Sequence, residues 1–276
     1  MIGAIFDSKL HRMFSVVLFW TTICSSTEPR PSKGPGKRRS RERVEVKSTK
    51  GKMDANRKLW NQGQQALRVA LSRPTDHQRA IELFLVQHAM VHSARMSQSR
   101  LWSLEDAVWE GLTEEAIRCI PLNHEHSIIW NIWHIARIED ITMNLLIAGT
   151  PQVLSEADWP NRMRVKARDT GNTMNSQEVK NFSLRVDIEA LRAYRNAVGR
   201  RTREIIKCLE PGETKQKIEP SRLQRLKDEE AVLDKAEWLI RYWGRLNKAG
   251  LLLMPPTRHN FIHLNEAVRL KQKTLT

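Results

Sequence analysis

From Met53 onward, apolar residues recur at intervals of three and four, and no run shows the strict alternation that is typical of a strand. The clearest segment begins at Ser127 and carries isoleucine, tryptophan and leucine side chains as far as Gly149, with Pro151 just beyond. A serine at the start and a glycine followed by a proline at the end are typical helix boundaries. The pattern therefore predicts an all-α chain organised around buried helices.

The same signals predict further helices, over about residues 55–70, 76–96, 104–120, 187–209, 228–246 and 257–271. Residues 150–186 are polar and poorly periodic, and so long a connection in a compact domain is usually a functional segment or a crossover. Residues 250–256 are interpreted as an apolar connector. With the short elements set aside, four long helices remain, which predicts a four-helix bundle with extra short helices. Bundles of this kind build metal and cofactor sites from side chains on facing helices.

The N-terminal segment differs from the rest in charge. The chain has 46 Lys and Arg against 31 Asp and Glu, a net charge of +15, and residues 1–52 alone hold twelve basic and four acidic residues. Residues 30–52 contain prolines and glycines and few large apolar side chains, which predicts a disordered basic tail. We therefore separate a signal-like and basic segment, residues 1–52, from a folded domain over residues 53–276. The mature protein need not contain residues 1–52. Translation that starts at Met53 is an alternative.

A short, largely apolar run of a dozen residues, Met13–Cys24, follows Lys9 and Arg12. The run is shorter than the ~20 residues that span a bilayer, but it matches the apolar region of a signal peptide. No clean small-residue cleavage site follows, and three scattered cysteines do not form a disulfide framework. We therefore expect a cytoplasmic protein with no stable membrane association. Export or anchoring is the alternative if this run acts as a signal.

The residues suited to chemistry are histidines. His259 and His263 are four positions apart, so on a helix their rings project from one face and can hold one divalent ion; a hydrogen-bonded core pair is the alternative. His134, in the apolar segment that begins at Ser127, is the candidate third ligand. Three imidazoles leave positions open to water or a thiol, as in catalytic metal sites, and such a nitrogen donor set fits zinc, nickel or iron(II).

Other polar residues are candidates for supporting roles. His88 and His92 form a second pair four positions apart. They are interpreted either as a packed polar stripe or as a pair of which one residue is a fourth ligand or a general base. Glu139 and Glu266 lie close to the candidate ligands in sequence, as carboxylates that orient imidazole N–H groups often do; ordinary solvated carboxylates are the alternative. His88, His92 and Glu139 are thus the catalytic candidates. Arg137 is expected to reach another helix or an anionic substrate.

The run from Ser127 to Asp140 with His134 inside it, followed about 120 residues later by His259-x3-His263, resembles the DinB/YfiT-like superfamily of helical bundles. The resemblance covers roughly residues 55–272. It implies that His134, His259 and His263 together bind one divalent metal ion. Several members of that family are metal-dependent thiol transferases or isomerases that use bacillithiol or mycothiol, and a related domain occurs in the iron-dependent sulfoxide synthase of ergothioneine biosynthesis. The family usually continues after the histidine pair with Arg-Gly-Gln, where this chain has Leu264-Asn265-Glu266.

These observations favour a divalent-metal-binding protein, either a metal-dependent thiol S-transferase or a hydrolase-type enzyme acting on a small electrophile. A low-molecular-weight thiol is the expected partner, and a homodimer is an open alternative to a monomer. A non-catalytic metal-binding or stress-associated bundle is a second function class. A third, less favoured class is a nucleic-acid-associated module that uses the basic tail, because such a tail attaches loosely to any polyanion. No specific nucleic-acid partner is expected.

Overall fold

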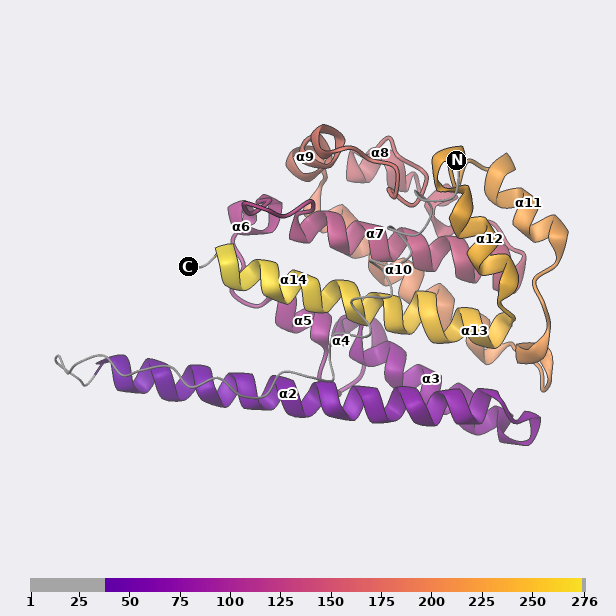
Figure 1. The fold of residues 1–276 in the computed structure, drawn as a ribbon, viewed down its shortest axis with the longest axis horizontal. Coiled ribbons are helices and arrows are strands. Elements are labelled where there is room, and N and C mark those ends of the chain that lie inside the picture. Colours follow the sequence, from indigo (N-terminus) through magenta and orange to yellow (C-terminus); the bar gives the residue numbers. More distant parts are fainter. Residues whose placement is uncertain (1–37, 275–276) are drawn as a thin grey trace, which may run out of the picture. The chain divides into compact units, whose positions relative to one another are not determined.

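The computed structural model describes residues 38–274, with side chains from residue 51 onward (Figure 1). Over these residues the regular structure is helical, apart from an isolated bridge between Lys217 and Asn247, so the all-α prediction is confirmed there. By its internal contacts the chain divides into Met1–Gly51 and Lys52–Thr276. Within the described part of the chain, no helix is both long and apolar enough to cross a membrane. The apolar run Met13–Cys24 lies outside the described residues.

The basic segment differs from the predicted tail where the structure describes it. Residues 38–52 belong to helix α2 (Arg38–Leu71), whereas residues 30–37 lie outside the described part. Arg, Lys and Glu have high intrinsic helix propensity, and a helix that is already nucleated extends by one hydrogen bond per added residue. Among the described side chains of α2, those of Trp60 and Leu67 enter the core.

Helix α7 (Ile128–Asp140) is the centre of the fold, and every one of its residues is buried. Ser127 caps its start by accepting the N–H of Trp130. The helix continues as a π-helical segment, η2 (Ile141–Ala148), which is capped by Gly149. Gly149 has a φ of 75°, a backbone conformation that favours glycine. This confirms the predicted boundaries. Helix α7 packs against α10 (Ile188–Lys207) and α14 (Asn260–Thr274), and α14 runs beside it in Figure 1.

Shorter helices surround this centre, and several predicted long helices are divided. Residues 76–96 form α3 (His77–Met90) and α4 (Ala94–Ser97), and residues 104–120 form two helices separated at Gly111, which has a φ of 67°. The predicted helix over 228–246 begins only at Glu237. The remaining elements are α5 (Leu104–Trp109), α6 (Glu114–Arg118), α8 (Trp159–Met163), α9 (Ser176–Arg185), α11 (Pro220–Asp228), α12 (Glu237–Arg245), α13 (Lys248–Leu253) and the single turns η1 (Pro74–Asp76), η3 (Val153–Ser155), η4 (Glu213–Lys215) and η5 (Asp234–Ala236).

The predicted connector over residues 250–256 is instead helical. It contains most of α13 and the first half of a π-helical segment, η6 (Met254–His259). Pro255 and Pro256 cannot donate backbone hydrogen bonds, so the helix widens here rather than ending. Thr257 Oγ1 donates to the Leu252 carbonyl at 3.0 Å, and Gln64 Nε2 of α2 donates to Thr257 Oγ1 at 3.1 Å. These bonds fix the turn from which the histidine pair projects.

A chain beginning at Met53 should unfold cooperatively, with a melting temperature within about 3 °C of the full chain. The reason is that Lys52–Thr276 forms a compact unit of its own, within which the described apolar clusters lie. Circular dichroism melting of both proteins checks this. Loss of the cooperative transition in the shorter chain would instead assign the basic segment to the domain.

Candidate metal centre

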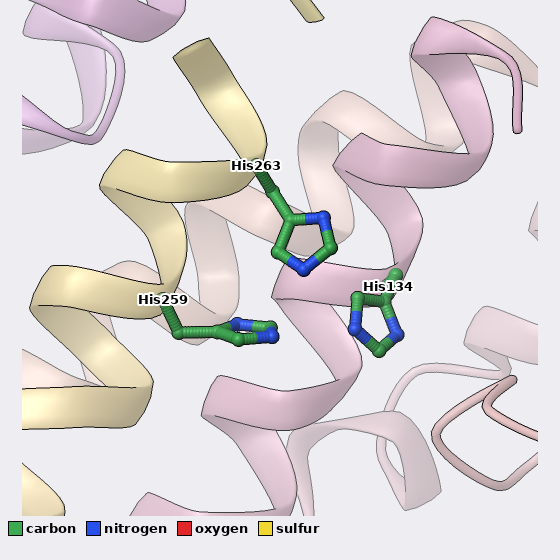
Figure 2. A group of neighbouring side chains, drawn as sticks. All are labelled: His134, His259 and His263. Carbon is green, nitrogen blue, oxygen red and sulfur yellow. The ribbon is translucent and has the colours of Figure 1, made fainter. Parts of the chain in front are cut away.

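The three candidate ligands come together although they are distant in sequence. Figure 2 shows the rings of His134, from α7, and of His259 and His263, from the η6–α14 junction, turned toward one another. Their ring centroids are 4.4 to 5.0 Å apart, and one ligand atom from each lies within 4.8 Å of the others. His134 and His259 are buried, and His263 is half-buried. We call these three residues the histidine triad.

The hydrogen bond of His134 fixes its tautomer. Its Nδ1 lies 2.6 Å from the carbonyl oxygen of Thr170, which can only accept, so Nδ1 carries the proton and Nε2 keeps a free lone pair. Thr170 belongs to the long polar connection, in a tight turn where Asp169 Oδ1 accepts the Gly171 N–H at 2.6 Å. Gly171 has a φ of 77°, and an added Cβ would lie 2.4 Å from the Trp133 ring. The long polar connection therefore contributes a backbone acceptor to the site.

His263 is held in the same way by α7. Its Nδ1 lies 2.7 Å from Asn131 Oδ1, and the Asn131 amide nitrogen donates to the Ser127 carbonyl at 2.9 Å. The amide is thereby oriented with its oxygen toward the ring, so His263 also donates from Nδ1 and keeps its Nε2 lone pair. His259 Nδ1 is buried and has no hydrogen-bond partner among the described residues.

Burial keeps the triad neutral. Desolvation lowers the pKa of His134 to about 4, against a weaker opposing effect of the Thr170 carbonyl. Desolvation, and then the neighbouring imidazoles, hold the pKa values of His259 and His263 well below the usual range. Neutral imidazole is the form that binds metal. Three neutral rings, two with oriented lone pairs and one with an unpaired buried nitrogen, fit a divalent metal ion.

The catalytic candidates outside the triad form a second group. His88 Nε2, from α3, and His92 Nε2, two residues past the end of α3, each lie 2.8 Å from a different oxygen of Glu139 on α7. Glu139 therefore does not orient a triad imidazole, and neither His88 nor His92 belongs to the triad's set of ligand atoms. Glu266 also lies elsewhere: its carboxylate is 3.5 Å from His124 and 3.1 Å from Arg269.

Arg137 was expected to reach another helix or an anionic substrate, and in the structure it reaches α10. Its guanidinium pairs with Asp140 at 2.9 Å and also donates to the Tyr194 hydroxyl at 2.6 Å on α10. A further bond, 2.5 Å long, goes to the Arg168 carbonyl, two residues before Thr170. Arg137 is fully buried, so it supports the turn that holds His134 rather than offering a charge to a substrate.

Several supporting residues escaped the sequence interpretation. Three of them share one property, a polar side chain buried within a helix, and they are Asn131, Thr202 and Asn260; the fourth, Thr170, acts through its backbone carbonyl in a loop. Buried polar side chains are rare without a partner, so their occurrence in otherwise apolar helical patterns was a usable signal. Their partners, however, depend on how distant helices meet.

Replacing Asn131 with alanine should weaken divalent-metal binding by about tenfold to a hundredfold, because His263 loses the acceptor that orients its ring. A metal-affinity titration with a competing chelator measures the change. Asn161→Ala is a matched control, because that exposed side chain bonds only to Asp158. Equal affinities for Asn131→Ala and the wild type would remove Asn131 from the site.

Comparisons with known proteins agree with this geometry in part. A sequence model of the DinB superfamily matches residues 99–243, a span that includes His134 but ends before the other two triad residues. Among curated proteins none matches the chain. A solved structure, the crystal structure of a conserved protein from Enterococcus faecalis, is similar with a TM-score of 0.49 and 14% identity, covering 70% of this chain and 96% of that one.

Proposed function

Because the chain belongs to the DinB superfamily, whose sequence model matches more than half of it, we propose that its histidine triad binds one divalent metal ion and serves a metal-dependent enzyme. The proposed reaction is transfer of a low-molecular-weight thiol to a small electrophile, or a related hydrolysis. Zinc, nickel and iron(II) are the candidate ions, since all three accept imidazole ligands.

One observation carries the proposal. His134 and His263 each donate Nδ1–H to a fixed oxygen acceptor, Thr170 O and Asn131 Oδ1, and so present Nε2 lone pairs toward a shared centre. Metal-binding histidines in proteins almost always donate their second ring nitrogen in this way. Buried N–H groups also need acceptors in a packed trio of core histidines, but such a trio would leave the converging Nε2 lone pairs facing one another with no proton or cation between them.

When bound, the ion would supply a Lewis acid that lowers the pKa of a thiol or water. The chain's own residues would hold the imidazole rings and limit the approach of a substrate to the ion. The Trp130 ring stacks on the His134 ring, with centroids 4.7 Å apart. The His126 ring in turn stacks on the Trp130 ring, with centroids 3.8 Å apart. His263 is the most exposed triad member, so approach from its side is favoured.

The test uses untagged protein that is stripped with a chelator and reloaded separately with Zn²⁺, Ni²⁺ or Fe²⁺. Each sample is incubated with a low-molecular-weight thiol and a small electrophile, and loss of free thiol is followed. Metal-dependent turnover is expected in the wild type and should be absent from a folded His134→Ala/His263→Ala variant. Tight metal binding without turnover against any thiol and electrophile pair would favour the non-catalytic class instead.

A further inference from the structure

A second group of possible ligands lies inside the domain, formed by His88, His92 and Glu139. His88 lies in the last turn of α3 and His92 two residues past its end, with ring centroids 4.2 Å from each other, and each points a ring nitrogen at one oxygen of the α7 carboxylate. All three side chains are fully buried. One ligand atom from each lies within 4.8 Å of the others.

The charge of this group has no fixed counterion in contact with it. Besides the histidines, Glu139 accepts hydrogen bonds from Thr202 Oγ1 at 2.8 Å and Asn260 Nδ2 at 2.6 Å, and neither of these carries charge. Among the described residues, the ion-pairing partners of Glu139 are the two histidines. A buried carboxylate is costly unless it is paired with a cation or coordinates a metal.

Other deeply buried carboxylates in this chain are compensated differently. Glu105 pairs with the buried Arg195 at 2.6 Å, and Asp140 pairs with the buried Arg137 at 2.9 Å. At Glu139, two histidines occupy the position that an arginine takes in those pairs. Two imidazoles and a carboxylate form a donor set that binds zinc and other first-row divalent metals.

The ring nitrogens that face the carboxylate are the Nε2 atoms, so these would be the metal ligands. The outer Nδ1 atoms of His88 and His92 are buried and have no hydrogen-bond partner among the described residues, unlike the outer nitrogens of His134 and His263 in the triad. Gly199 of α10 lies so close to the His92 ring that an added Cβ would be 2.8 Å from Nδ1. The rings are thus enclosed by protein, with one unpaired nitrogen each, in a group that also holds a negative charge.

We infer that His88, His92 and Glu139 bind a second divalent metal ion, separate from the histidine triad. Because every donor is fully buried, this ion has a structural role. It ties α3 to α7, and through Thr202 and Asn260 the same carboxylate also contacts α10 and the start of α14. The inference does not depend on the proposed enzymatic function.

The experiment counts metal ions per chain in untagged, chelator-stripped protein that is reloaded with Zn²⁺ and dialysed. Elemental analysis should give two equivalents for the wild type, one for His134→Ala/His263→Ala and one for Glu139→Gln. Glu105→Gln is the matched control, because it also neutralises a buried, paired glutamate, and it should keep two. One equivalent in the wild type, or two in Glu139→Gln, would overturn the second site.

A melting experiment keeps the inference testable if Glu139→Gln fails to fold. In the His134→Ala/His263→Ala variant, chelation should lower the melting temperature by about 5–10 °C, as expected when a tightly bound structural ion is removed. No change on chelation would overturn the inference. If instead this variant keeps the wild-type metal content while Glu139→Gln loses one equivalent, the triad proposal fails and the second site stands.

Discussion

His263→Ala should bind zinc at the histidine triad about a hundredfold or more weakly than the wild type. Zinc sites with four protein ligands bind with about 10–16 kcal/mol, so the loss of one ligand from three removes several kcal/mol. His263 is also the triad member whose ring is held by Asn131. A competition titration with a chromophoric chelator at pH 7.5 measures the affinity, and circular dichroism establishes that the variant is folded.

The control for this prediction is His126→Ala. His126 stacks on Trp130 beside the site but is not among the triad's ligands, so its removal should change zinc affinity by less than about threefold. If both variants lose affinity equally, the effect is packing around α7 rather than coordination. If His263→Ala binds zinc as the wild type does, the triad is not the zinc site.

The convergence of the triad could be predicted because local geometry decides most of it. Residues four apart on a helix share a face, which settles the His259 and His263 pair, and His134 lies in a helix whose ends are marked by Ser127 and Gly149. The two helices are brought together by tertiary packing. The sequence indicated that packing only through the family resemblance.

The role of Glu139 was misjudged because closeness in sequence was used in place of helical geometry. Five residues along an α-helix correspond to a rotation of about 140°, so Glu139 and His134 face different neighbours, whereas Asn131, three residues before His134, lies nearly on its face. The carboxylate consequently meets His88 of α3 and His92, which lies just past the end of that helix. Thr170 could not be predicted as a partner at all, since its carbonyl is placed by the path of a long loop.

Helix boundaries also divide into those decided by local sequence and those decided by tertiary packing. Ends set by a local cap, such as Ser127 and Asp187, were predicted well. Segments that depend on context were not: residues 250–256, which include the two prolines at 255 and 256, were interpreted as a connector, yet they are helical and continue past the prolines as the π-helical segment η6. Proline excludes a backbone donor but does not decide what the neighbouring carbonyls do next.

Chelator-stripped protein should lose several kcal/mol of stability between pH 7 and pH 5. His134 shows the sign most clearly, because its ring contacts a neutral carbonyl and not a carboxylate. Its folded-state pKa is lowered by burial to about 4, from the ordinary value of 6.5 that applies when the chain is unfolded. Between these values the unfolded state binds more protons, so stability is present above pH 6.5 and is lost as the pH falls toward 4. At pH 5 this one residue accounts for about 2 kcal/mol.

Urea unfolding at pH 7 and pH 5 measures the loss, and His134→Gln tests its origin. The variant should lose about 2 kcal/mol less than the wild type over this interval, because glutamine binds no proton. Burial lowers the pKa values of His259 and His263 in the same direction, so part of the loss should persist. Identical losses in the two proteins would show that His134 is not held neutral by burial. The same result would weaken the case that its Nε2 lone pair is available to a metal at physiological pH.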